Sequence, residues 1–358
     1  MRLISLENII DETHSLAKTI LSEDGQVLLR SGTKLTLSLV KRLKERGIPF
    51  VYIEDSLTEG IEVPDVISLE TRQMALQKTS RLMFKLLSKK SRDFISPENF
   101  DIRDVVSEII NDIQAHPASM YNLVNMQSMD DYLFHHSVNV GILAIIMGTR
   151  MHYTKDRLVE LGIGATLHDV GKTLIPLEIL NKPGRLSDEE YEIMRQHPVH
   201  GFHILKEQFT IPLVSAHIAF QHHERWNGSG YPRGLVGKQQ HEYARITAIA
   251  DVYDALISKR SYRDSYLPHE ALELLFGAGD YHYDYDLVKL FRDNIAIYPV
   301  GMSILLMDGR VAVISKENRI TPQRPRVRVI TDHERKPVKS SYEVDLNMDT
   351  DIFIRGVM

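Results

Sequence analysis

The segment HDVGK, residues 168–172, places three ionisable side chains at the end of the apolar run LVELGIGATL. Unpaired charges beside a core cost free energy, so His168, Asp169 and Lys172 indicate a metal site, a catalytic site or an ion-pair network. Neighbouring helical positions point roughly 100° apart, so the Asp169 carboxylate could bridge two metal ions while His168 holds one. The alternative is a helix C-terminus with a solvated His–Asp pair and a favourable lysine.

Histidine is concentrated in one third of the chain, because eleven of the sixteen histidines lie between residues 130 and 245. The pair His222–His223 follows a helical pattern and precedes a glycine-rich loop, which suits a metal-binding rim. A single histidine elsewhere is more often a hydrogen-bonded core residue than a ligand. Further candidates on helical patterns are His135, His136, His197, His200 and His203.

Asp251 is the second candidate carboxylate. It lies in ARITAIADVYDAL, residues 244–256, a helical pattern in which an ionised carboxylate needs a counter-charge that a metal would supply. Imidazoles and carboxylates without sulfur suit iron or manganese, with zinc, cobalt or nickel as substitutes. Two adjacent ions would generate a hydroxide near neutral pH and would clamp the attacking and leaving oxygens of a phosphodiester. Hydrolysis of a phosphate ester is therefore the leading chemistry.

The composition is that of an ordinary globular protein. The 358 residues, 43% of them hydrophobic, can build two or three domains. The longest apolar run, VGILAIIMG at 140–148, is about half of the ~20 residues that a membrane-spanning helix needs. No leader peptide is indicated, and the absence of cysteine fits the cytoplasm. A net charge of −5 gives no reason to expect a nucleic-acid duplex as partner.

Four segments differ in their patterns, which predicts a multidomain, mainly α protein. Residues 1–65 predict a small α+β module of unknown ligand. Residues 66–116 predict a charged helical connector that could pair two subunits into a homodimer. Residues 117–293 predict a helical domain that carries every candidate ligand. Residues 294–358, with short β-branched runs separated by turns, predict a small β domain.

Residues 125 to about 275 resemble the HD-GYP family, the bacterial cyclic di-GMP phosphodiesterases of the HD superfamily. An HD pair alone would be weak, but the order and spacing of the motifs are specific. These motifs are HSVNV at 136, HDVGK at 168, NKPGRLSDEE at 181, HPVHG at 197, HHERWNGSGYP at 222 and RITAIADVYDALISKRSYR at 245. The resemblance implies an all-α HD-type catalytic domain that hydrolyses cyclic di-GMP to linear pGpG, which further hydrolysis would convert to GMP.

Carried over position by position, the resemblance implies two divalent metal ions, iron or manganese. The motif HS selects His136 over His135, which helical spacing leaves open. Members with three metals carry a glutamate four residues earlier, where this chain has Tyr132, and Asp131 points about 140° away on a regular helix. The implied ligands are His136, His168, Asp169 and Asp251 for one ion, and Asp169, His197, His222 and His223 for the other.

The resemblance also implies roles for five residues around the metals. Lys172 would stabilise charge on the substrate phosphate or leaving group, and Asp169 would act beside it in catalysis. Glu224 could orient one of the paired histidines through a hydrogen bond. Tyr231 could stack on a guanine or support the rim. Arg260 and Arg263 could bind phosphates, although their motif KRSYR has serine where the family has proline.

Three alternatives remain open at this stage. The protein could be an HD phosphohydrolase of another nucleotide, which substrate profiling would reveal. It could be a sensory module that binds nucleotide and signals by contact, although the intact HDVGK motif argues against that. It could catalyse an oxidation at a di-iron centre, which would require an oxygen-dependent product.

Overall fold

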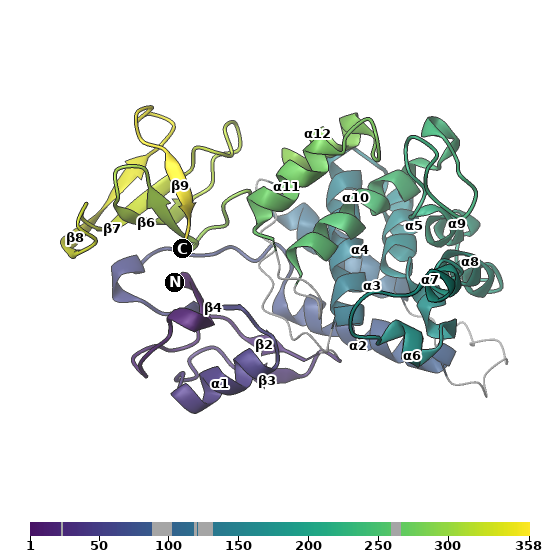
Figure 1. The fold of residues 1–358 in the computed structure, drawn as a ribbon, viewed down its shortest axis with the longest axis horizontal. Helices are drawn as coiled ribbons and strands as arrows, with labels where there is room; N and C mark the ends of the chain where they lie inside the picture. Colours follow the sequence, from purple (N-terminus) through teal and green to yellow (C-terminus); the bar gives the residue numbers. More distant parts are fainter. Residues whose placement is uncertain (23, 88–101, 118–119, 121–131, 259–265) are drawn as a thin grey trace.

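The computed structural model combines a large helical domain with two small strand-containing units (Figure 1). It describes the whole chain apart from residues 23, 88–101, 118–119, 121–131 and 259–265. The helices of the large domain gather on one side of the molecule, and the strands of both chain ends lie on the other. The predicted class, a mainly helical domain flanked by an α+β module and a small β domain, is confirmed.

Polar side chains that accept from backbone N–H groups define the starts of several helices. Thr154 accepts from the N–H of Arg157 before α5, and Ser187 and Glu190 form a reciprocal capping box at α7. The helices of the large domain are α2 (Leu69–Leu87), α3 (Ile102–Ala115), α4 (Tyr132–Arg150), α5 (Lys155–Thr166), α6 (Leu177–Leu180), α7 (Asp188–Met194), α8 (His197–Lys206), α9 (Leu213–Gln221), α10 (Glu242–Ile257), α11 (Pro268–Gly277) and α12 (Tyr285–Arg292), with the 3-10 helices η4 (Val170–Leu174) and η5 (Gly237–Gln239).

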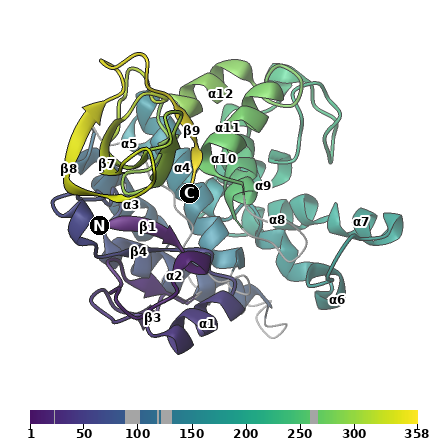
Figure 2. The same cartoon turned by 60° about the vertical axis from the view of Figure 1, so that its left-hand side comes forward.

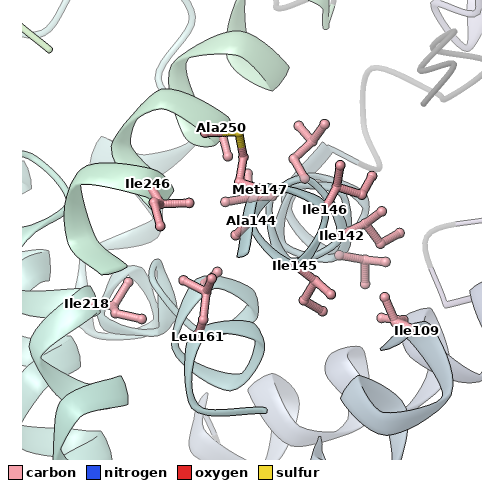
Figure 3. Close-up of a cluster of buried hydrophobic side chains, with 14 of the residues drawn as sticks. Ile109, Ile142, Ala144, Ile145, Ile146, Met147, Leu161, Ile218, Ile246 and Ala250 are labelled. Atoms are coloured by element: carbon pink, nitrogen blue, oxygen red, sulfur yellow. The ribbon is translucent and has the colours of Figure 1, made fainter. Parts of the chain in front are cut away.

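Helix α4 forms the centre of the helical core (Figure 3). Its residues 138–148 are buried, because other helices surround it. Ile145 of α4 lies among buried side chains that include Ile109 of α3, Leu161 of α5 and Ile246 of α10. The apolar run at 140–148 is therefore a core helix. Among the helices described, none has the length and hydropathy needed to cross a bilayer.

Helices α2 and α3 belong to the same core. Leu76 of α2 and Ile109 and Ile110 of α3 are buried in the cluster that contains α4 and α5. The sequence predicts a connector at residues 66–116, and the burial of α2 and α3 against α4 and α5 was not foreseen. The domain boundaries and the pairing of subunits stay predictions.

The two chain ends contribute antiparallel strands. In the N-terminal unit, β1 (Arg2–Ser5) pairs with β4 (Phe50–Ile53) and β2 (Ile20–Leu21) with β3 (Val27–Leu29), beside α1 (Leu37–Glu45) and the short 3-10 helices η1 (Leu6–Asn8) and η2 (Ser56–Thr58). The C-terminal unit is a five-stranded sheet of order β8-β7-β6-β5-β9. Its strands are β5 (Ser303–Leu306), β6 (Val311–Lys316), β7 (Arg326–Thr331), β8 (Pro337–Asp345) and β9 (Ile354–Val357).

The N-terminal and C-terminal units share an apolar core. Leu3 and Tyr52 are buried in one cluster with side chains of β5, β6 and β7. The N–H of Leu3 donates to the carbonyl of Gly301 at 2.8 Å, and the Tyr52 hydroxyl donates to the carbonyl of Val300 at 3.3 Å. Figure 2 shows β1 close to the C-terminal strands. The two ends of the chain thus fold against each other beside the helical domain.

Glu317, just after β6, lies beside Met120, a few residues after the end of α3. Burial raises the pKa of Glu317 to about 7, although the N–H of Met120 and the charge of Arg319 oppose the shift. Arg319 also donates to the carbonyl of Pro117 at 3.1 Å. Because the pKa is higher in the folded state, Glu317 favours folding fully below its unfolded pKa. That contribution is lost as the pH rises through about 7.

Replacing Glu317 with glutamine is therefore expected to stabilise the protein at alkaline pH. The shift corresponds to at most about 3 kcal/mol, and we expect about 1–2 kcal/mol at pH 8 because the side chain is only partly buried. The advantage should shrink steadily towards pH 5. Denaturant unfolding at both pH values measures it, with the exposed Glu334→Gln as control. An advantage that does not depend on pH would contradict the assignment.

Candidate metal centre

Buried histidines and carboxylates from separate helices meet in two adjoining groups. In each group the side chains offer nitrogen or oxygen atoms that all lie within 4.8 Å of one another. His136 comes from α4, Asp251 from α10, and His168 and Asp169 from the link between α5 and η4. His197 begins α8, and the paired histidines directly follow α9. The groups are His136, His168 and Asp251, and Asp169, His197, His222 and His223.

The Asp169 carboxylate connects the two groups. Its Oδ2 lies 3.3 Å from Nε2 of His168 and 3.8 Å from Nε2 of His136. Its Oδ1 lies 3.4 Å from Nε2 of His197 and 3.6 Å from Nε2 of His222. One oxygen therefore faces each group, which is the arrangement that a bridging carboxylate needs.

Three of the histidines are oriented by their own helical turns. Nδ1 donates to the carbonyl three residues earlier, at 2.8 Å in His168, 2.7 Å in His197 and 2.8 Å in His222. Because a carbonyl can only accept, Nδ1 carries the hydrogen in each ring. The Nε2 lone pair is then directed at Asp169, as metal-binding histidines require.

Two buried polar atoms at the centre of the site make no hydrogen bond. They are Nε2 of His168 and Oδ1 of Asp169. Such atoms are costly in a protein interior unless a partner satisfies them. A divalent cation would satisfy both, and the donors, imidazole nitrogen and carboxylate oxygen without sulfur, suit first-row transition metals. The residues present therefore fit divalent metal binding.

The charges of the site favour ionised carboxylates. Burial opposes ionisation of Asp169, but Lys172, whose Nζ lies 2.5 Å from Oδ2, and His168 outweigh it. They hold the pKa of the Asp169 carboxyl well below its usual range. The pKa of Asp251 is likewise low, because its hydrogen bond with His136 and neighbouring charges outweigh its burial.

The pKa of His136 differs in direction from the pKa values of the three histidines in the other group. Burial lowers the pKa of His197 to about 3 and also lowers the pKa of His222 and His223, so these rings stay neutral, which is the form that binds a metal. Burial also opposes protonation of His136, but Asp251 and a further carboxylate on α10 outweigh it and raise its pKa to about 9. Metal binding at Nε2 of His136 would therefore release a proton.

Gly171 allows η4 to contact the start of α8. A Cβ at this position would lie 1.9 Å from the carbonyl oxygen of His197 and 2.5 Å from the backbone nitrogen of Gly201. Any side chain would push α8 away. The glycine of HDVGK therefore allows His197 to lie close to Asp169.

Glu224 holds the glycine-rich loop that follows the paired histidines. It is buried, and its two oxygens accept from the N–H groups of Arg233 at 2.8 Å and Leu235 at 2.9 Å. The same loop passes so close that a Cβ at Gly230 would lie 2.5 Å from Cα of Glu224. The expectation that Glu224 orients a histidine is therefore corrected: its recorded hydrogen bonds hold the loop backbone.

Replacing Glu224 with alanine is expected to loosen residues 225–235. Hydrogen bonds to a charged acceptor contribute about 1.5–3 kcal/mol each, so loss of the two bonds should lower the free energy of unfolding by about 3–6 kcal/mol. Trypsin should cleave faster after Arg225 and Arg233. Glu224→Gln keeps one acceptor and should give an intermediate loss. Unchanged stability and cleavage rate in the alanine variant would refute this role.

Tyr231 stacks on His223, with ring centroids 4.8 Å apart and planes inclined by 25°. The guanidinium of Arg195 lies 4.8 Å from the centre of the same ring. These contacts match the second of the two expected roles, support of the rim. Stacking of a guanine on Tyr231, the first expected role, stays a prediction.

Some predicted residues lie outside the described part of the chain. Arg260 and Arg263 are among them, and so is Asp131, the alternative third-metal ligand. Tyr132 is described only as the first residue of α4. Their roles stay predictions.

Two polar residues beside the site were missed in the sequence. Asp254 is fully buried on α10 and accepts from Nδ1 of His136 at 2.7 Å. Asn139 on α4 donates to Asp254 at 2.9 Å. Each lies three residues after a predicted ligand, His136 or Asp251, and therefore on the same helical face. That spacing is the sequence feature that could have revealed them.

Comparison with known proteins gives related phosphodiesterases. A cyclic di-GMP phosphodiesterase of Pseudomonas aeruginosa is 29% identical over 331 residues, which cover 86% of this chain and 79% of that protein. A 3′3′-cGAMP-specific phosphodiesterase of Vibrio cholerae is 44% identical over 129 residues, which cover 36% of this chain and 25% of that protein. An HDG"Y"P protein from Bdellovibrio bacteriovorus has a similar fold, with a TM-score of 0.51 and 18% identity over 81% of this chain and 98% of that chain.

Two family models match the chain. The model described as a KOW domain associated with HD domain matches residues 303–358, which form the C-terminal sheet. The model described as HD domain matches residues 104–287, which contain both metal groups. The resemblance drawn from the motifs is confirmed: this model covers just over half of the chain, and the chain belongs to the HD domain family.

Proposed function

We propose that the protein is a metal-dependent phosphodiesterase that hydrolyses cyclic di-GMP to pGpG at a two-metal site, with GMP as the product of further hydrolysis. The ligands would be His136, His168, Asp169 and Asp251 for one ion, and Asp169, His197, His222 and His223 for the other. Bound iron or manganese would supply a hydroxide nucleophile near neutral pH and Lewis acidity at the phosphate.

The observation that carries this proposal is the position of Asp169. Its two oxygens face two different groups of donors, and the Oδ1 atom is buried without a hydrogen bond. A purely structural ion-pair network would be expected to satisfy both oxygens of a buried carboxylate. Two ions that share Asp169 satisfy both groups, which favours a two-metal site over the ion-pair alternative.

The remaining residues of the site would act on the substrate. Lys172 is the cation nearest Asp169 and is partly exposed, so its ammonium can reach a phosphate oxygen beside the metal groups. Glu224 and Tyr231 hold the rim. Arg260 and Arg263 would bind substrate phosphates through directed N–H donors.

The relatives make a second substrate class worth testing. One relative is named for cyclic di-GMP and another for 3′3′-cGAMP. Both of these nucleotides are cyclic dinucleotides with phosphodiester bonds. The longer match to the cyclic di-GMP phosphodiesterase favours that substrate. The position of the partly exposed Lys172 beside Asp169 suits stabilisation of transition-state charge, which favours an enzyme over a binding module without turnover.

The test is a substrate profile of the full chain, purified without oxygen and loaded with Mn²⁺ or Fe²⁺. Cyclic di-GMP, 3′3′-cGAMP and cyclic di-AMP are offered at equal concentration, and the products are separated by chromatography. We expect pGpG to form fastest from cyclic di-GMP and to require the metal. Faster cleavage of another nucleotide would support the alternative phosphohydrolase. Nucleotide bound by the metal-loaded chain but never cleaved would support the sensory module.

A further inference from the structure

Asp254 contacts the first metal group, which is formed by His136, His168 and Asp251. Its carboxylate has no exposed surface, and its Oδ2 accepts from Nδ1 of His136 at 2.7 Å. Its Oδ1 accepts from Nδ2 of Asn139 at 2.9 Å, and the Ser258 hydroxyl lies 3.5 Å from Oδ2. Asp254 belongs to neither donor group, so its described contacts bear on the metal only through His136.

Asn139 and Asp254 belong to a row of hydrogen-bonded side chains that runs from Arg72 to His136. The amide of Asn139 has only one possible orientation in this row. Its Oδ1 accepts from Nη1 of Arg72 on α2 at 3.0 Å. Because a guanidinium can only donate, the other end of the amide must be its NH₂ group, which faces Asp254. One oxygen of Asp254 is thereby occupied, and the other is left for His136. The row runs from α2 through α4 to α10 and back to α4.

His136 depends on this row in a way that the other oriented histidines do not. His168, His197 and His222 donate from Nδ1 to a carbonyl of their own helical turn. His136 donates instead to a side chain on another helix. Its Nε2 then lies 3.1 Å from Oδ1 of Asp251, within the metal group. Rotation of the ring would move that nitrogen out of the group, and the other tautomer would place a hydrogen on it and leave no lone pair for a metal.

We propose that Asp254, held by Asn139 and Arg72, is a positioning residue that fixes the tautomer and direction of His136 for metal binding. The inference rests on the proposed function only in so far as the first group holds a metal. Hydrogen-bond partners of this kind change metal affinity by about 10–100-fold. We therefore expect Asp254→Asn to weaken one of the two metal sites by that factor and to leave the other unchanged.

A second substitution in the same row of hydrogen bonds is expected to restore the metal affinity lost in Asp254→Asn. In Asp254→Asn the new amide has one acceptor and one donor end, so it must set an NH₂ group against either Asn139 or His136, both of which donate. Adding Asn139→Asp corrects this conflict. The new carboxylate at position 139 can accept from Arg72 and from the amide at position 254, whose carbonyl is then free to accept from His136. The net charge of the double variant equals that of the parent.

The experiment compares four full-length proteins stripped of metal: the parent, Asp254→Asn, the double variant Asp254→Asn with Asn139→Asp, and Asp284→Asn. Asp284 serves as control, because its largely buried side chain pairs with Arg245 outside both metal groups. Mn²⁺ is titrated against a competing chelator, and thermal unfolding is recorded without metal. We expect Asp254→Asn to lose about 10–100-fold affinity at one site and the double variant to regain most of it. The control should lose stability only.

Two results would overturn the proposal. One is an Asp254→Asn variant that binds both Mn²⁺ ions as tightly as the parent. The other is a folded double variant that binds Mn²⁺ no better than Asp254→Asn does. The same comparison applies if Asp254→Asn fails to fold. Failure of the proposed function would look different. The parent would then bind two Mn²⁺ ions and show the same affinity pattern among the variants, yet cleave no cyclic dinucleotide.

Discussion

Replacing Asp169 with alanine is expected to abolish hydrolysis of cyclic di-GMP and to leave both metal groups incompletely occupied. Asp169 places one oxygen against each group, so a single truncation removes a ligand from both ions. Loss of several kcal/mol of charge stabilisation, taken as about 4 kcal/mol, lowers turnover by about a thousandfold. The fold should persist, because the carboxylate contributes little apolar packing and the remaining Lys172 is partly exposed to water.

The measurement combines metal content per chain by elemental analysis after anaerobic reconstitution with turnover of cyclic di-GMP and thermal unfolding. Asp293→Ala serves as control, because this aspartate pairs with Arg292 on the exposed end of α12. The control should retain two ions per chain and parental turnover. Near-normal turnover of Asp169→Ala with both ions bound would show that the bridging assignment is mistaken.

The choice between His135 and His136 shows what a helical pattern can and cannot decide. Both side chains are buried, so burial alone would not have separated them. Neighbouring residues on a helix point about 100° apart, and therefore only one can face the metal groups. His136 faces Asp251, whereas Nε2 of His135 lies 3.1 Å from the carbonyl of Ser22 in the N-terminal unit. The family motif favoured His136, while the pattern of the chain gave no reason to prefer it.

Residues that act through distant partners were harder to predict. Glu224 follows His223 in sequence, which suggested a hydrogen bond between neighbours, but its partners lie nine and eleven residues further along the chain. Asp254 was missed, although it lies three residues after Asp251 on α10. Its burial depends on the packing of α10 against α4, which the sequence of α10 does not contain.

The burial of the helices before the site was not predicted, for a related reason. The charged pattern of residues 66–116 predicts a connector, because its polar positions are numerous. Its apolar positions nevertheless form a buried face, as Leu76 and Ile109 show. Arg72 of the same segment reaches Asn139 beside the metal site. One face of such a helix packs into a core, and its polar side chains contact a site. Its sequence pattern alone does not distinguish it from a connecting helix.

Replacing Lys172 with alanine is expected to leave both metals bound and to lower turnover by about 10²–10³-fold, the loss typical of removing one group that stabilises transition-state charge. The Lys172 ammonium has no lone pair with which to hold a metal. Its Nζ lies 2.5 Å from Oδ2 of Asp169, and its side chain is 22% exposed. Lys172 thus places a positive charge at the boundary between the metal groups and the solvent, where a bound phosphate would develop negative charge.

Two comparisons separate this role from a general effect of removing a lysine. Lys44→Ala breaks a more exposed ion pair, because Lys44 lies 3.1 Å from Glu7 in the N-terminal unit, and it should change neither turnover nor metal content. Lys172→Arg keeps the charge but places it differently, so it should recover part of the lost kcat. The loss in Lys172→Ala should fall on kcat more than on KM, since the charge acts chiefly in the transition state. If that variant instead lost both metals, Lys172 would be needed to hold Asp169 in place, and its role would be structural.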